Sequence, residues 1–286
     1  MPDGVQRADG AGSLVALRGV SRRNGLVQVL NGIDLDLAGS QVTALLGPPG
    51  AGKTVLCRAV GGSERIDSGS ITVAGVPLRR RHRRFARTYG EGAGGLATVA
   101  EPGGLPAHRT VLQNVAAGRR TGSDRLWRPC LADAGRRAQA LLERVGAAGY
   151  DAHFPWELSE ELRLRVAIAR ALAAAPAAIL VDPPASRAVP GPSAPGAAEA
   201  GAAEAGPDGG ADATVRPTLA ALLRGIAADG LAVLVTTGDP AFARAAADRV
   251  VFMEGGRIIE QGVPEEFFTT PRTARARAFL SAAAAP

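Results

Sequence analysis

Aromatic side chains, long apolar runs and paired cysteines are all scarce in this chain of 286 residues. Aromatic residues make up only 4%, which argues against the stacked rings that bind RNA bases or sugars. No apolar run reaches the roughly 18 residues of a membrane span, and no signal-peptide segment opens the sequence. The two cysteines, Cys57 and Cys130, lie far apart without metal-ligand spacing. We therefore expect a cytoplasmic protein, with Cys57 as a reduced core thiol.

Positive charge is in excess, which can indicate contact with nucleic acid, contact with membrane phospholipid or simple solubility. The net charge is +6 and is carried mostly by arginine. The densest cluster, Arg79–Arg84, reads RRRHRR, and a solvated loop is its simplest interpretation. We expect no nucleic-acid partner.

Short apolar segments alternate with helical patterns along much of the chain. The strands expected are 14–20, 27–37, 41–46, 71–75, 177–182, 231–236, 249–254 and 257–260. The helices expected are 53–60, 218–229 and 240–247, with helical periodicity across 110–175 and a helical tail at the C-terminus. No pattern is recognised in the glycine-rich stretch 86–107. The alternation predicts an α/β fold with a mainly parallel sheet covered by helices.

Composition marks an N-terminal tail and an insertion outside the patterned segments. We expect a disordered tail over 1–13. Residues 185–216, rich in Pro, Ala and Gly, are expected to form a disordered insertion, because so long an irregular loop is rare inside a compact domain.

The segment GPPGAGKT fits the phosphate-binding pattern G-x-x-x-x-G-K-[ST], between an expected strand and an expected helix. Its backbone amides and helix N-terminus suit a triphosphate. Lys53 would reach the β- and γ-phosphates, and the Thr54 hydroxyl would bind Mg²⁺ with Asp182 as second ligand. The predicted residues that bind the nucleoside triphosphate are Gly47, Pro48, Pro49, Gly50, Ala51, Gly52, Lys53, Thr54 and Val55.

Several segments together resemble the ATP-binding subunits of ABC transporters. They are VLNGIDLDLAGSQVTALLGPPGAGKT, TVLQNV, ELSEELRLRVAIARAL, AAILVDPP and ADRVVFMEGGRIIEQGVPEEF. The resemblance extends from about residue 14 to 270, so we expect one domain over 14–270 and a C-terminal tail over 271–286. It implies a P-loop NTPase cassette with an antiparallel β subdomain and a helical subdomain over about 110–175. It also implies a membrane-spanning permease subunit, a second cassette as partner, and a peripheral place at the inner face of the cell membrane. In that family ATP lies between one cassette's phosphate loop and the partner's signature motif.

The sequence departs from the family where that family does its chemistry. Pro183 stands at the position of the glutamate that activates water, and Gly238, or its neighbour Thr237, stands at that of the switch histidine. The signature LSGGQ reads LSEEL, with Glu160 and Glu161 in place of the glycines. Ala100 or a neighbour stands at the position of the Q-loop glutamine, and Val189 stands at that of the D-loop aspartate. Asn24 stands at the position of the aromatic residue that stacks on adenine.

These departures predict a cassette that binds Mg-ATP and hydrolyses it poorly or not at all. No catalytic residue is assigned. Such a chain would be the regulatory or structural half of a heterodimer with a second, intact cassette. The first alternative is an active transport ATPase. Others are an ABC ATPase that acts on nucleic acid and the product of a decaying gene. The transported substrate and the direction of transport stay open.

Overall fold

The computed structural model describes residues 13–78, 95–100, 104–119, 131–183 and 218–284. The expectations for the N-terminal tail up to residue 12, for Arg79–Arg84, for Cys130 and for the insertion at 185–216 lie outside these residues. So does Val189.

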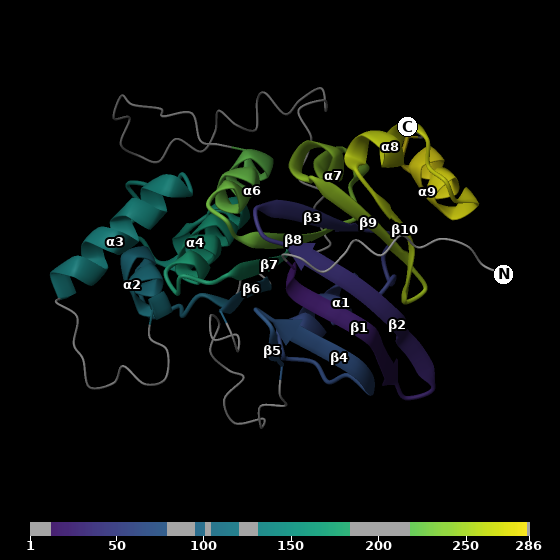
Figure 1. Ribbon diagram of the computed structural model, residues 1–286. Coiled ribbons are helices and arrows are strands. Elements are labelled where there is room, and N and C mark those ends of the chain that lie inside the picture. The colour runs from purple at the N-terminus through teal and green to yellow at the C-terminus, as the bar shows by residue number, and fades with distance from the viewer. Residues whose placement is uncertain (1–12, 79–94, 101–103, 120–130, 184–217, 285–286) are drawn as a thin grey trace.

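A six-stranded sheet forms the centre of the molecule, with the strand order β10-β9-β3-β8-β7-β6 (Figure 1). Its members are β3 (Gln41–Leu46), β6 (Leu96–Ala100), β7 (Ala178–Asp182), β8 (Ala232–Thr237), β9 (Arg249–Glu254) and β10 (Arg257–Gly262). All pair in parallel except β10, which is antiparallel to β9. β3, β7 and β8 are buried over nearly their whole length, as expected for strands covered on both faces.

A second, antiparallel sheet has the order β2-β1-β4-β5. It comprises β1 (Ser13–Asn24), β2 (Val27–Ala38), β4 (Ser68–Val73) and β5 (Val76–Pro77). Helix α1 (Lys53–Val60) packs in one apolar cluster with side chains from both sheets, among them Leu17, Leu35 and Leu180. This cluster also contains Cys57, which is 1% exposed and is a free thiol, as expected.

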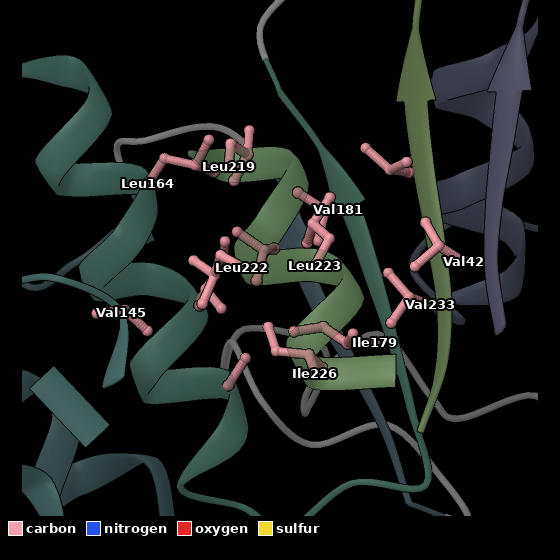
Figure 2. Close-up of a cluster of buried hydrophobic side chains, with 14 of the residues drawn as sticks. Val42, Val145, Leu164, Ile179, Val181, Leu219, Leu222, Leu223, Ile226 and Val233 are labelled. Atoms are coloured by element: carbon pink, nitrogen blue, oxygen red, sulfur yellow. The ribbon is translucent and has the colours of Figure 1, made fainter. Parts of the chain in front are cut away.

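Helices cover the opposite face of the six-stranded sheet (Figure 1). Of these helices, α4 (Glu160–Leu172), α6 (Leu219–Ala228) and α7 (Pro240–Ala246) contact its strands. The helices α2 (Val111–Ala116) and α3 (Leu131–Arg144) pack on α4 beside the sheet, with 3₁₀ turns at Ala117–Arg119 and Pro155–Glu157. Figure 2 shows α6 between the sheet and α4: Leu223 lies toward Val181 of β7, and Leu222 lies on the side of α4. α6 is thus apolar on two sides because both are covered.

The expected α/β fold, with a mainly parallel sheet, an antiparallel subdomain and a helical layer, is confirmed. The strand β6 was missed, because it lies in the stretch over 86–107 where no pattern was recognised. The C-terminal stretch carries α8 (Pro264–Thr269) and α9 (Ala274–Ala284). In α9, Ala276 is buried and the Phe279 ring lies 5.1 Å from that of Phe252 in β9.

Candidate functional site

The loop between β3 and α1 turns sharply at glycines. Gly50 and Gly52 have φ angles of +78° and +99°, in the left-handed region that residues with a Cβ rarely adopt. Gly47 is constrained by space instead, because a Cβ there would lie 2.1 Å from the carbonyl oxygen of Met253 in β9. The loop therefore lies directly against the end of the neighbouring strand.

The N-terminus of α1 is open toward this loop. Gly52 is the N-cap, no side chain caps the helix within the described structure, and no acid lies in its first turn. The first intrahelical hydrogen bond runs from the amide of Leu56 to the carbonyl of Gly52, at 2.9 Å. The amides of Lys53, Thr54 and Val55 in the first turn of α1 and the positive end of the helix dipole are thus available to an anion.

Lys53 extends back over the loop. Its Nζ donates hydrogen bonds to the carbonyl oxygens of Gly47, at 2.6 Å, and Pro48, at 2.9 Å. Partial burial lowers the pKa of the Lys53 ammonium from its ordinary value, and the Asp182 carboxylate acts in the opposite direction. The ammonium therefore lies within the loop whose amides would bind phosphate.

Asp182 lies at the carboxyl end of β7 and is buried, with 7% of its surface exposed. The Thr54 hydroxyl donates to its Oδ1 at 3.4 Å, and the Thr236 hydroxyl of β8 donates to the same oxygen. One carboxylate and one hydroxyl beside a phosphate loop suit Mg²⁺, which prefers oxygen ligands and usually completes its shell with water and substrate phosphates. Among the described residues, no three or more His, Cys, Asp or Glu side chains lie close enough together to form a metal site by themselves.

The structure brings the predicted ATP-binding residues, Gly47 to Val55, together with the two predicted metal ligands at one edge of the sheet. It also adds Thr236, which the sequence interpretation missed. Ala232, Leu234 and Thr236 alternate along the strand and are all buried. A polar residue in this otherwise apolar series is the sequence signal that could have indicated Thr236.

The two positions expected to lack catalytic groups lie at the same edge. Pro183 follows Asp182 directly and is partly buried. Gly238 follows β8, and a Cβ there would be 3.7 Å from the carbonyl oxygen of Gly47. Neither a proline nor a glycine side chain can take or give a proton. Ala100, at the Q-loop position, ends β6 opposite Asp182.

The segment LSEEL forms an ordinary helix start. Ser159 caps α4 by accepting a hydrogen bond from the amide of Leu162, at 3.3 Å, and Glu160 and Glu161 lie in the first turn. The Glu161 carboxylate accepts from Nε of Arg165 at 3.0 Å. Arg165 is 2% exposed and also donates to the Val145 carbonyl at 2.8 Å, so Glu161 places a negative charge beside a buried guanidinium.

The predicted adenine-contact position, Asn24, ends β1 and pairs with Val27 across the hairpin turn to β2. Leu26, at this turn, is 96% exposed. None of the helices in the described part of the chain has both the length and the apolar character to cross a membrane.

Comparison with known proteins identifies the family. The family model described as "ABC transporter" matches residues 30–186. The glutamate transport ATP-binding protein GluA of Corynebacterium efficiens is 32% identical over 267 residues, covering 93% of this chain and 98% of its own length. The glutamine transport ATP-binding protein GlnQ of Geobacillus stearothermophilus is 32% identical over 265 residues, covering 92% and 96%.

Solved structures agree on the fold. The structure of cbiO1 from Clostridium perfringens, part of an ABC transporter complex, superimposes with a TM-score of 0.68 at 23% identity, covering 91% of this chain and 92% of that one. The phosphate loop, the sheet order and the extent of these matches give one conclusion: the chain belongs to the ABC transporter family and has the fold of its ATP-binding cassettes.

Proposed function

We propose that this chain binds Mg-ATP as the ATP-binding subunit of an ABC importer and hydrolyses it slowly or not at all. One observation carries the proposal. The phosphate loop is complete: Lys53 contacts Gly47, and Thr54 contacts Asp182. Beside it lie Pro183 and Gly238, which have no side-chain group that can exchange a proton.

Binding rests on groups that the chain itself supplies. The uncapped amides at the start of α1 and the Lys53 ammonium would hold the phosphates. Thr54 and Asp182 would hold Mg²⁺, which would neutralise phosphate charge when bound. Asn24 is polar and lies at a hairpin turn, so it would give the base less stacking surface than an aromatic ring.

Slow hydrolysis is expected because two catalytic groups are missing beside the phosphate loop. Loss of a general base typically lowers a rate by about 10² to 10⁴. Loss of one group that stabilises developing charge in the transition state typically lowers kcat by about 10² to 10³. Because Pro183 and Gly238 occupy the positions that the resemblance assigns to those two groups, both factors would apply to the site built on this phosphate loop.

The start of α4 adds a second obstacle, in the site that a partner cassette would complete. Glu160 and Glu161 lie in the first turn of α4, and the resemblance assigns them to the positions whose glycine amides would meet the partner's γ-phosphate. Two carboxylates there oppose an approaching phosphate and offset the helix dipole. The ion pair with Arg165 reduces the charge of Glu161 but also holds its carboxylate at the helix start.

The partners follow from the family. A membrane-spanning permease subunit would dock on the helical subdomain over about 110–175, and a second, intact cassette would supply the hydrolysis that this chain does not. With these partners the chain would lie at the inner face of the cell membrane, and no nucleic acid would be required. The names of GluA and GlnQ suggest an amino acid as the transported substrate.

The test is to measure binding and turnover on the same preparation. Calorimetric titration with ATP and Mg²⁺ should show binding that the Lys53→Ala variant loses, and a steady-state assay should show turnover below about 0.1 s⁻¹, a tenth of the low end for typical enzymes. Faster turnover that Lys53→Ala abolishes would refute the proposal and establish an active transport ATPase. That alternative is favoured by the near full-length similarity to transport ATP-binding proteins.

A further inference from the structure

Strand β8 carries a hydroxyl group at a position where its pattern calls for an apolar side chain. Ala232 and Leu234 pack on the face of the sheet that α1 covers, whereas Val235 and Val233 belong to the cluster on the face that α6 covers. Figure 2 shows Val233 on that face. Thr236 continues the first set and is 3% exposed. A buried hydroxyl is unfavourable without a hydrogen-bond partner, so its partner is informative.

That partner is Asp182 on the neighbouring strand. The parallel register pairs Val181 with Val235, so the next residues, Asp182 and Thr236, lie side by side and face the same way. The Thr236 hydroxyl donates its hydrogen bond to Oδ1 of Asp182. Thr54 donates to this oxygen too, but at 3.4 Å, near the outer limit for such a bond.

We propose that Thr236 is a positioning residue that fixes the Asp182 carboxylate for Mg²⁺; this inference rests on the proposed Mg-ATP site. The torsion that turns a carboxylate has broad minima, and a hydrogen bond from outside the ligand set restricts it. When the Thr54 hydroxyl is engaged by the metal, Thr236 still holds the carboxylate from β8. Its place in a parallel sheet, between β3 and β7, makes it a rigid support.

The competing explanation is that the bond merely satisfies two buried polar groups. In that case its removal would lower the stability of the protein without changing its response to Mg²⁺. Thr43 provides a matched control, because it is also a buried threonine on a central strand, 1% exposed, and its hydroxyl has no hydrogen-bond partner within the described structure. Thr43→Val and Thr236→Val are the same isosteric change, but only the second removes a bond to Asp182.

The experiment measures the Kd for ATP with Mg²⁺ and with EDTA, for the wild type and for Thr43→Val, Thr236→Val and Thr236→Ser. The quantity compared is the gain in ATP affinity that Mg²⁺ gives each protein. We expect Thr236→Val to reduce this gain by about 10- to 100-fold, the usual effect of losing a partner behind a metal ligand. Its Kd in EDTA should stay within about twofold of the wild type. Thr236→Ser should restore most of the gain, and Thr43→Val should not change it.

Each remaining outcome is decisive. If Thr236→Val keeps the wild-type gain, or if Thr236→Ser loses it like valine, the inference is wrong while the proposed function stands. If the wild type binds no ATP, or binds it without a gain from Mg²⁺, the proposed function fails and the inference with it. Unfolding by urea, run on all four proteins, shows whether each variant is folded. The double variant Asp182→Ala/Thr236→Val should show the same Mg²⁺-dependent gain in ATP affinity as Asp182→Ala alone, because Thr236 acts through this carboxylate; a smaller gain in the double variant would refute that.

Discussion

Gly47→Ala tests how tightly the phosphate loop is packed against the sheet. The added Cβ would lie 2.1 Å from the carbonyl oxygen of Met253 and 3.2 Å from its carbonyl carbon. A carbon and an oxygen in favourable contact are about 3.3 to 3.6 Å apart, so one of the two backbones must move by about 1 Å. Since Met253 belongs to β9, which pairs with β3 next to the loop, the movement disturbs both the sheet and the site.

The magnitude follows from this clash with main-chain atoms. Overpacking typically costs about 1 to 3 kcal/mol, and a rigid backbone on both sides places Gly47→Ala near about 3 kcal/mol. A protein of this size loses about 2 to 4 °C of Tm for each kcal/mol, so the expected fall is about 6 to 12 °C. ATP affinity should fall as well, because the loop carries the phosphate-binding amides.

Differential scanning calorimetry without nucleotide measures the effect, with Gly238→Ala as the control. Gly238 lies next to the same loop, but a Cβ there would be 3.7 Å from the Gly47 oxygen, an ordinary contact. Its Tm should stay within about 2 °C of the wild type, in line with small surface effects. A Gly47→Ala protein that melts together with Gly238→Ala would refute the packing argument.

Three further predictions concern the site and its surroundings. ATP at 100 times Kd should stabilise the folded wild type by about 2.7 kcal/mol and so raise its Tm, and Lys53→Ala should abolish this rise. A rise that persists in thermal-shift assays of Lys53→Ala would show that Lys53 does not bind phosphate. Burial, with the Asp182 carboxylate adding to it, raises the pKa of the Cys57 thiol well above its ordinary value of 9.0. The neutral thiol is therefore favoured in the folded state, so its contribution to stability is present below about pH 9 and is lost as the pH rises above it, by up to about 1.4 kcal/mol per pH unit. Urea unfolding between pH 8 and 10 should show a steeper loss of stability for the wild type than for Cys57→Ala, and equal slopes would contradict this. Pro183→Glu combined with Gly238→His should raise ATP turnover by at least about 10², whereas an unchanged steady-state rate would mean that the loss lies elsewhere.

Much of the sheet and the phosphate loop could be predicted because the signals are local. The bounds of α1, Lys53–Val60, follow from the glycine loop that ends at its first residue and from the apolar spacing behind it. β8 was expected one residue early, at 231–236 instead of Ala232–Thr237, because an isolated strand does not show where its pairing stops.

The remainder depends on contacts between distant segments. The five residues of β6 have no clear alternation, and their strand forms because each pairs with a residue of β7, from Leu96 with Ala178 to Ala100 with Asp182. The contact of Thr236 with Asp182 can be predicted only if the register of β7 and β8 is known, because the two residues are 54 positions apart in the sequence. Glu161 and Arg165, by contrast, lie four residues apart on one helix, so their pairing was open to prediction.

The position of Lys53 inside the loop has a chemical consequence, since it is the only lysine in the sequence. Apart from the α-amino group, an acylating reagent therefore finds a single primary amine in this chain. The lowered pKa of that amine leaves a larger share of it unprotonated and nucleophilic at a given pH. Covalent labelling of one side chain thus reports on whether the loop around it is occupied, and a bound triphosphate would shield that amine.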